Sequence, residues 1–480
     1  MKQLFRGRIS RGFIWKAACL SGGVLVLALL FTKFFTVSSP VRADAADWST
    51  YLNGNAHTGY NATETVINQT SAPGLRLHWI APAGTRVFSQ PVIANGMIYW
   101  GSWDGFEHAS TLNGTQVWKQ FVGISITRCG ALSTDGQVGT TTVAPVSING
   151  TMTEVAFVPG GDANLYALNA LTGAIIWQLP LGGPMSNIFL WDSPSVFNGS
   201  VYIGTASLGD CPLIQSQVVR VDAASGTLQN TFNIVPPGCI GGSLWGSLTI
   251  DEAAGTLYFA TGNGTRCKPP ERNAEALVEL RTSDLAFISS WKLPKAESVN
   301  DGDFGSTPTL FQSTINGTVV QMVGLANKNG TYYAFDRSAI GNGPLWRATI
   351  AVGGTCPQCG KGSISPSAWD GATLYVAGGN TTINSVACKG SLRALDPATG
   401  AFLWENCFPD GPVLAAVTVV PGVAMVIEGQ FLALVNADSG KVLYKSSVSN
   451  RKLHFYGAIS VSNGVLYVGS RNQGLYALGL

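Results

Sequence analysis

Charged residues are scarce in this chain. Asp, Glu, Lys and Arg make up 12% of its 480 residues, and the formal net charge is only +2. Long surface helices need more charge than this, so a fold built from such helices is not expected. The body of the chain has no block of basic residues that could hold phosphates, which argues against nucleic acid as a partner.

Several catalytic motifs are also missing. The four histidines show no metal-ligand spacing, and no nucleophile elbow occurs. The stretch Gly262-Asn-Gly264 does not complete a dinucleotide-binding fingerprint. The sequence therefore gives no support for a histidine-based metal centre, an α/β-hydrolase or a nucleotide-binding fold.

Glycine is abundant, at 58 residues, and aromatic residues reach 10%. This balance is typical of many short strands joined by tight turns. The hydrophobic content of 46% is enough to bury a large core. Length alone suggests two or three domains, but internal repeats make that estimate unreliable.

The first 43 residues differ from the rest of the chain. Five basic residues precede an apolar run over residues 17–32, and Val41-Arg42-Ala43 offers a cleavage site, a pattern that predicts an export signal. The apolar run is shorter than the ~18–20 residues that cross a bilayer comfortably, so residues 1–43 are either a signal peptide or an N-terminal membrane anchor. In both cases residues 44–480 are expected outside the cytoplasm, in the periplasm, at the cell surface or secreted.

Nine cysteines are present, and eight of them follow this segment. An even number outside the cytoplasm predicts disulfide bonds. Cys356-Pro-Gln-Cys359 could also be a redox motif or half of a zinc site, but it lacks a βαβ context and a second close pair, which favours a structural bridge. No histidine follows it, so attached haem is not expected and electrons would leave through another protein. The eight are Cys129, Cys211, Cys239, Cys267, Cys356, Cys359, Cys388 and Cys407.

A short sequence motif that ends in Asn-Gly recurs along the chain. Its clearest copies cover residues 91–96, 145–150 and 194–199. Asn-Gly is the preferred hairpin turn because both positions tolerate positive φ, so each copy ends one strand and begins another. Looser copies bring the total to eight, which predicts the eight blades of a β-propeller. These looser copies begin at Leu248, Pro308, Pro366, Val417 and Ile459.

A second hairpin follows in the repeat and ends in tryptophan. Residues 165–177 and 392–404 show it most clearly, and Trp118, Trp291 and Trp346 occupy the same position elsewhere. We interpret these tryptophans as anchors between neighbouring blades, because a closed ring needs large apolar contacts.

The last repeat ends at Leu480 after only three strands. Leu75–Trp79 ends in the same tryptophan and is predicted to supply the fourth strand, which would leave the ring without an open edge. The predicted fold class is therefore an all-β, eight-bladed β-propeller closed by an N-terminal strand in the last blade.

The repeat signature Tyr-Ala-Leu-(Asp/Asn)-Ala-x-Thr-Gly-x-x-x-Trp resembles that of the pyrroloquinoline quinone (PQQ) repeat family from Trp48 to Leu480. The stretches 48–79 and 327–337 look like segments of quinoprotein alcohol dehydrogenases and polyvinyl alcohol dehydrogenase-like proteins. The resemblance implies the eight-bladed fold. It is less specific for catalysis, because non-enzymatic assembly factors share the repeat.

The resemblance also implies a set of site residues. Trp245 corresponds to the tryptophan on which the quinone stacks, and Lys328 to the basic side chain that hydrogen-bonds the quinone oxygens. Asn263 corresponds to a calcium-site residue, and Asp303 to the general base, which could also bind calcium. A flat, tricarboxylated quinone needs such a platform, a cation, donors and a carboxylate that takes the alcohol proton. Taken singly, each residue would also suit a core, turn or loop role.

Three departures from the family pattern are visible. The calcium-binding Glu expected in the third repeat has no match, and Asp210 is at best a shifted substitute. Gln215-Ser216 stands where the family usually has Arg-Gly, and no adjacent pair of cysteines is present to cover the quinone. The missing Glu weakens the expected metal site most, because a bidentate carboxylate supplies both charge and two ligand atoms.

The function expected from these features is an exported quinoprotein-like oxidoreductase that uses PQQ and calcium to oxidise an alcohol or polyol. It would pass electrons to a separate acceptor such as a cytochrome or a quinone, and residues 17–32 could tether it to a membrane. The alternative is a non-catalytic propeller that binds protein, polymer or sugar.

Overall fold

The computed structural model describes residues 47–127, 133–183, 186–265, 267, 271–446, 455 and 457–480. The predicted export signal, the possible anchor at residues 17–32 and Cys129 lie outside these residues. Within them, no helix has both the length and the apolar character needed to cross a membrane.

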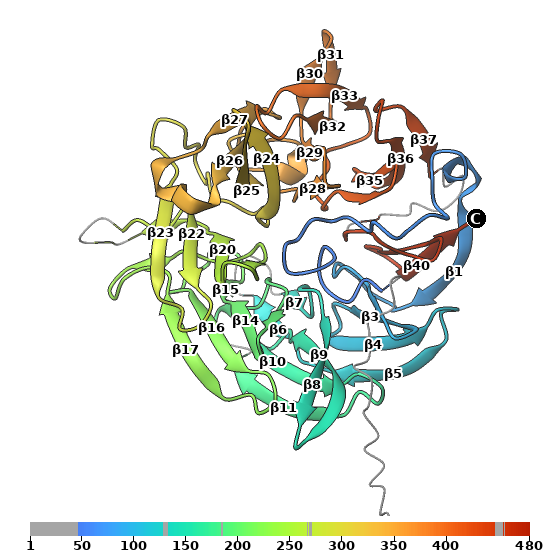
Figure 1. The fold of residues 1–480 in the computed structure, drawn as a ribbon. Coiled ribbons are helices and arrows are strands. Elements are labelled where there is room, and N and C mark those ends of the chain that lie inside the picture. Colours follow the sequence, from blue (N-terminus) through green and yellow to red (C-terminus); the bar gives the residue numbers. More distant parts are fainter. Residues whose placement is uncertain are drawn as a thin grey trace, which may run out of the picture. The chain divides into compact units, whose positions relative to one another are not determined.

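The described chain forms eight four-stranded antiparallel sheets arranged as the blades of a ring (Figure 1). This arrangement confirms the predicted fold class. Blades 1 to 4 consist of β2 (Val92–Ala94), β3 (Met97–Gly101), β4 (Phe106–Thr111) and β5 (Gln116–Phe121); β8 (Thr142–Ile148), β9 (Thr151–Pro159), β10 (Asn164–Asn169) and β11 (Ile175–Pro180); β13 (Ser195–Phe197), β14 (Ser200–Gly204), β16 (Gln217–Asp222) and β17 (Leu228–Asn233); and β19 (Thr249–Asp251), β20 (Thr256–Ala260), β22 (Ala276–Arg281) and β23 (Phe287–Lys292).

The second half of the ring repeats the same order of strands. Blades 5 to 8 consist of β24 (Thr309–Ile315), β25 (Thr318–Ala326), β26 (Thr331–Asp336) and β27 (Trp346–Thr349); β28 (Ala368–Trp369), β29 (Leu374–Gly378), β32 (Gly390–Leu395) and β33 (Phe402–Phe408); β34 (Thr418–Val420), β35 (Val423–Glu428), β36 (Phe431–Asn436) and β37 (Val442–Lys445); and β38 (Ser460–Ser462), β39 (Val465–Gly469), β40 (Gly474–Gly479) and β1 (Arg76–Pro82).

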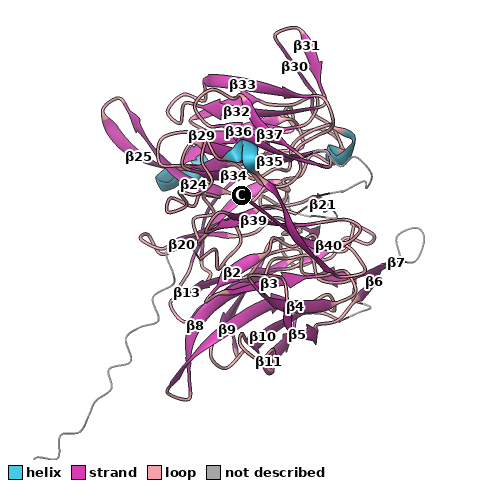
Figure 2. Cartoon of the chain, turned by 90° about the vertical axis from the view of Figure 1, so that its right-hand side faces the viewer, coloured by secondary structure: helices cyan, strands magenta, loops and turns pink. Residues whose placement is uncertain are grey.

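Small insertions are added to this ring. The edge-on view shows β6, β7, β21, β30 and β31 on one side of it (Figure 2). Within the described residues, the helices are three short 3-10 segments, η1 (Ala72–Gly74), η2 (Arg337–Asn342) and η3 (Pro357–Cys359). Two-stranded sheets are formed by β6 (Ser125–Thr127) and β7 (Ser133–Asp135), β12 (Ile188–Phe189) and β15 (Ala206–Ser207), β18 (Ile240–Gly241) and β21 (Gly264–Thr265), and β30 (Thr381–Ile383) and β31 (Val386–Cys388).

Strand β1 closes the ring as predicted. It pairs antiparallel with β40, in a register that runs from Arg76 opposite Gly479 to Pro82 opposite Gly474. Trp79 lies within this pairing, opposite Ala477. The N-terminal strand is therefore the outermost strand of blade 8, and the last blade is completed by residues from the opposite end of the sequence.

Tryptophans of the fourth strands hold neighbouring blades together, which confirms their interpretation as anchors. The Trp118 indole of blade 1 donates a hydrogen bond to the carbonyl oxygen of Ala170 in blade 2, at 2.9 Å. A β-carbon added at Gly173 would lie only 2.7 Å from this ring, so the glycine makes room for it. The same bond to the next blade recurs for Trp79, Trp177, Trp346 and Trp404.

An N-terminal segment, residues 48–61, crosses the middle of the ring and bonds to all eight blades (Figure 1, dark blue). We call it the axial segment. Its contacts follow the chain order of the blades, from Trp48 with Ile93 in blade 1 to Asn61 with Val461 in blade 8. Between these ends it bonds to Val143, Val196, Ile250, Leu310, Trp369 and Val419.

The cysteines of the described chain are oxidised, as predicted. Bonds join Cys239 to Cys267, Cys356 to Cys359 and Cys388 to Cys407. Cys211 is also disulfide-bonded. The Cys356–Cys359 pair is thus a bridge and not a zinc half-site.

The buried His57 of the axial segment should make the fold sensitive to acid. Its Nδ1 lies 2.9 Å from Thr249 Oγ1, and burial lowers its pKa from 6.5 to about 3. The unfolded chain therefore takes up a proton between these pH values that the folded chain does not. Stability should fall as the pH drops through this window, by about 1.4 kcal/mol per pH unit.

His57→Asn provides the test. His57 has a φ of 50°, a left-handed conformation that asparagine adopts readily. Urea unfolding at pH 6 and pH 4 should show a loss of stability in the wild type that is about 2–3 kcal/mol larger than in the variant. Equal losses in the wild type and the variant would show that folding does not lower the pKa of His57.

Candidate functional site

A cavity of about 600 Å³ opens on one face of the propeller. Its wall is made by the loops that join the second strand of a blade to the third, and the fourth strand to the next blade. Tyr51 of the axial segment also lines it. Residues from distant repeats therefore meet around one space.

Three carboxylates gather at this cavity. Asp210, Asp301 and Asp303 each place one oxygen so that all three oxygens lie within 4.8 Å of one another. Asp210 is exposed, whereas Asp303 is almost completely buried. Oxygen atoms in such an arrangement are the ligands that calcium prefers.

The loop that carries two of these carboxylates is fixed by Asn327. The amide of Asn327 donates hydrogen bonds to the carbonyl oxygens of Gly302, at 2.8 Å, and Asp303, at 3.1 Å. Asp301 adopts a φ of 56°. The turn in this Asp-Gly-Asp stretch brings both carboxylates to the Lys328 side chain.

Lys328 is buried and binds both carboxylates. Its Nζ lies 2.5 Å from Asp303 Oδ1 and 3.0 Å from Asp301 Oδ2. The same ammonium lies 5.1 Å from the centre of the Trp245 ring, in a cation–π contact. Burial alone would lower the pKa of Lys328, but the two carboxylates outweigh it and raise the pKa.

The pKa of Asp303 is strongly shifted from its ordinary value. Burial raises its pKa from 3.8 to about 7, against the opposing effect of Lys328. Its Oδ2 accepts a hydrogen bond from Trp245 Nε1 at 3.1 Å. A carboxylate with a pKa near neutrality is well suited to take up and release a proton.

Trp245 is half-buried and forms part of the cavity wall. A β-carbon at Gly305 would lie 2.0 Å from its ring, so the neighbouring chain packs directly against the six-membered ring of the indole. The indole is therefore held in place by its contacts with Gly305, Asp303 and Lys328.

Asn263 and Asp210 complete the cluster. The Asn263 amide donates to Asp301 Oδ1 at 2.6 Å and to Asp210 Oδ2 at 3.3 Å. Ser207 holds Asp210 through two bonds: its hydroxyl donates to Asp210 Oδ1 at 2.6 Å and accepts from the Asp210 backbone N–H at 3.0 Å. The five residues selected from the sequence thus lie together, while their roles stay predictions.

Asp301 was missed as a site residue by the sequence analysis. The signal was present, because Asp301 precedes Asp303 in the same Asp-Gly-Asp stretch. The aromatic wall of the cavity was also missed. It includes Phe88 and Trp103, whose rings meet edge to face at 4.9 Å, and Trp191. These residues lie in loops outside the repeat pattern.

The charge of the wall is unbalanced. Among the described residues that line the cavity, three are carboxylates and Lys328 is the one cationic side chain. Ionised together they leave two net negative charges. Gln215, which stands in place of the family's arginine, donates to the carbonyl oxygen of Val235 at 2.9 Å. The three carboxylates and the net negative charge of the wall therefore fit a bound cation.

The comparisons with known proteins define the family. The family model described as outer membrane protein assembly factor BamB, a model of the PQQ repeat, matches residues 110–264 and 328–479, more than half of the chain. The chain therefore belongs to this family of PQQ-repeat β-propellers.

Its relatives include a hydroxylase and a dehydrogenase. The chain is 24% identical over 331 residues to lupanine 17-hydroxylase [cytochrome c] of Pseudomonas sp, covering 61% of this chain and 46% of that protein. It is 26% identical over 402 residues to a polyvinylalcohol dehydrogenase of Pseudomonas sp, covering 63% and 61%. The chain thus spans about half to three fifths of these relatives' lengths.

The fold is shared with quinohemoprotein alcohol dehydrogenase from Comamonas testosteroni. The two structures agree with a TM-score of 0.68 at 19% identity, over 90% of this chain and 80% of the other. At this identity the likeness concerns the fold alone.

Cation binding at the three carboxylates can be measured with Tb³⁺, a luminescent substitute for Ca²⁺. We expect Tb³⁺ to bind and to be sensitised by Trp245, which hydrogen-bonds Asp303. Asp210→Asn and Asp301→Asn should each weaken binding at least about tenfold, because each removes a charged ligand. Asp284→Asn is the matched control, since Asp284 pairs with Arg281 on an exposed turn. Equal affinities in all variants would rule out this site.

Proposed function

We propose that the chain is an extracytoplasmic quinoprotein-like oxidoreductase that oxidises an alcohol or polyol with PQQ and calcium. The observation that carries this proposal is the cluster of Asp303, Lys328 and Trp245 on the wall of one cavity, with Asp210 and Asp301 beside them. Membership of the PQQ-repeat family and the name of the polyvinylalcohol dehydrogenase relative support it.

The residues present suit calcium. Asp210, Asp301 and Asp303 offer three carboxylates, and the Asn263 side chain contacts two of them. In this proposal Asp210 and Asp301 compensate for the glutamate that the sequence lacks. A divalent cation would neutralise the two net negative charges of the wall.

The cavity also suits a flat quinone. Its volume of about 600 Å³, the Trp245 ring and several lining hydroxyl groups provide space, a platform and hydrogen-bond partners. Bound PQQ would supply the two-electron acceptor. Lys328 would orient its oxygens, and the phenyl and indole rings of Phe88, Trp103 and Trp191, which also line the cavity, would exclude water.

Asp303 would act as the base. Its carboxylate is buried, and its pKa of about 7 allows it to accept the proton of an alcohol at neutral pH. Trp245 Nε1 and Lys328 Nζ hold its two oxygens in place. Electrons would then pass to a separate acceptor, such as a cytochrome or a quinone, and export would follow from the N-terminal signal.

PQQ binding should depend on calcium. Without a cation, the negative wall repels a ligand that carries three carboxylates. Titration followed by quinone absorbance should show at least about tenfold tighter binding with Ca²⁺ than with EDTA. The Asp210→Asn/Asp301→Asn double variant should lose most of this difference. The absence of PQQ binding under both conditions would favour the non-catalytic propeller.

Asp303→Asn separates binding from catalysis. Asparagine keeps the shape of the side chain but cannot act as a base. Because Asp303 is also a candidate cation ligand, PQQ and Ca²⁺ are raised until the variant is saturated, and the rate of dye-linked alcohol oxidation at saturation should still be about 10²–10⁴-fold lower than in the wild type. Asp284→Asn should behave as the wild type. A variant with normal turnover would exclude Asp303 as the base.

A further inference from the structure

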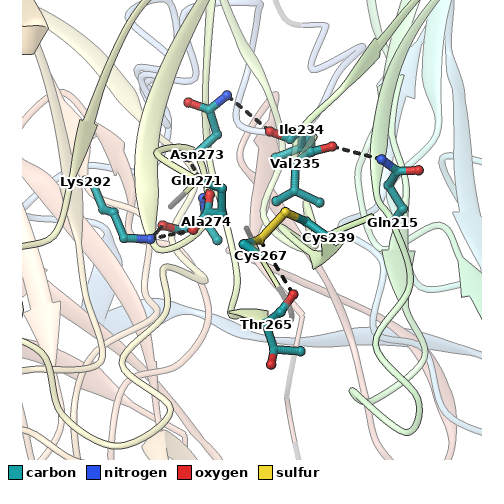
Figure 3. The surroundings of a disulfide bond; sticks show 10 residues. All are labelled: Gln215, Ile234, Val235, Cys239, Thr265, Cys267, Glu271, Asn273, Ala274 and Lys292. Atoms are coloured by element: carbon teal, nitrogen blue, oxygen red, sulfur yellow. Dashed lines mark hydrogen bonds and ion pairs between the residues drawn. A yellow bond between two sulfur atoms is a disulfide. The ribbon is translucent and has the colours of Figure 1, made fainter. Parts of the chain in front are cut away.

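The Cys239–Cys267 disulfide lies at the end of a small two-stranded sheet near the cluster, β18–β21 (Figure 3). This sheet contains only two residue pairs, Ile240 with Thr265 and Gly241 with Gly264. Two pairs of strand residues are a weak constraint by themselves. The covalent bridge directly beside them therefore contributes much of what holds the two segments together.

Each strand of this small sheet leads directly into the candidate site. Gly241 is followed by Gly242, Ser243, Leu244 and Trp245. Gly264 is preceded by Asn263, whose carbonyl oxygen accepts a hydrogen bond from Gly242 N at 2.8 Å. A β-carbon at Gly241 would lie 2.1 Å from the same oxygen. The position of Asn263 is thus set by close backbone contact with the segment that carries Trp245.

The same segment also holds the loop that carries Asp210. Gly241 N donates to the carbonyl oxygen of Ile214 at 2.6 Å, and Ser216 N donates to the carbonyl oxygen of Gly241 at 3.2 Å. Ser207 N donates to Ser243 Oγ at 3.1 Å, and Ser207 in turn binds Asp210. The segments that carry Trp245, Asn263 and Asp210 are therefore all held by contacts with residues 241–243.

The disulfide is anchored in the hydrophobic core of blades 3 and 4 and by hydrogen bonds of the flanking chain. Cys239 is buried within the core of blades 3 and 4, and Cys267 packs against that core. Asn273 donates to the carbonyl oxygen of Ile234 at 3.1 Å, and Gln215 donates to that of Val235 at 2.9 Å, as Figure 3 shows. These bonds fix the chain on both sides of the bridge, so its loss would free mainly the small sheet and the site residues beyond it.

We propose that Cys239 and Cys267 are positioning residues for the cation site, so that the site is assembled only when their disulfide is formed. The inference rests on the cation site proposed above. Reduction by a dithiol would transfer two electrons and two protons to the pair, giving two thiols while the reductant becomes a disulfide. The blades would stay folded, because their sheets do not depend on this bridge.

The test compares two double variants by Tb³⁺ titration. Cys239→Ser/Cys267→Ser should bind Tb³⁺ at least about tenfold more weakly than the wild type, since it loosens Asn263 and Asp210. Cys388→Ser/Cys407→Ser, which removes the bridge between β31 and β33, is the matched control and should stay within about twofold of the wild type. If the first variant fails to fold, Cys239→Ala/Cys267→Ala replaces it, because alanine places no hydroxyl group in the apolar core around Cys239.

Hydrogen exchange without metal provides a second readout. The backbone amides of Gly241 and Gly242, which bond to Ile214 and Asn263, should lose protection at least about tenfold in the Cys239→Ser/Cys267→Ser variant. Protection in β20 and β22 should not change.

The outcomes separate the two proposals. Unchanged Tb³⁺ affinity with unchanged amide protection would overturn the inference and leave the cation site intact. If the oxidised wild type fails to bind Tb³⁺, the cation site is refuted, and with it the role of the bridge in cation binding. Hydrogen exchange then tests separately whether the bridge holds the β18–β21 sheet: unchanged exchange would overturn this, and faster exchange confined to the sheet would support it.

Discussion

The axial segment is the contact on which the rest of the molecule depends. Propeller blades bury their faces against their neighbours, but nothing in the blade repeat itself fills the centre of the ring. Here one continuous stretch does so and bonds to the innermost strand of every blade. Trp48 and Leu52 are completely buried in it. The ring is thereby fixed from inside as well as by the closing strand β1.

This central support also shapes the cavity. Tyr51 of the axial segment lines it, together with polar and aromatic side chains of the surrounding loops. The cluster at its wall has more carboxylates than cations, and Lys328 and Asn263 bridge the carboxylates. Such a group is stable without a ligand because each of its carboxylate oxygens has a hydrogen-bond or ion-pair partner.

The fold could be predicted from the sequence because its signals are periodic. Asn-Gly turns, a tryptophan in the fourth strand and a last repeat with one strand too few depend on local chemistry and simple counting. The site was harder to predict. Trp245, Asn263, Asp303 and Lys328 were found through a resemblance to a family, whereas their mutual contacts depend on four different loops.

Asp301 shows where the sequence analysis fell short. Two acidic residues separated by glycine looked like one motif with one functional member, and only the turn at Asp301 brings both carboxylates to Lys328. The supporting role of Cys239 and Cys267 was not predicted either, since a count of cysteines predicts oxidation but not partners. Loop geometry of this kind is set by long-range contacts and not by local propensity.

The order of the axial contacts has a consequence for how the chain is made. During synthesis the N-terminal stretch emerges first, and its partners appear one blade at a time, beginning with Ile93 and ending with Val461, which lies 400 residues from Asn61. Strand β1 likewise cannot pair until β40, the last strand of the chain, has been synthesised. Contacts between residues this distant in sequence form late in folding. An unfinished chain therefore exposes the apolar side chains that the completed ring buries at its centre, until the last blade has been synthesised.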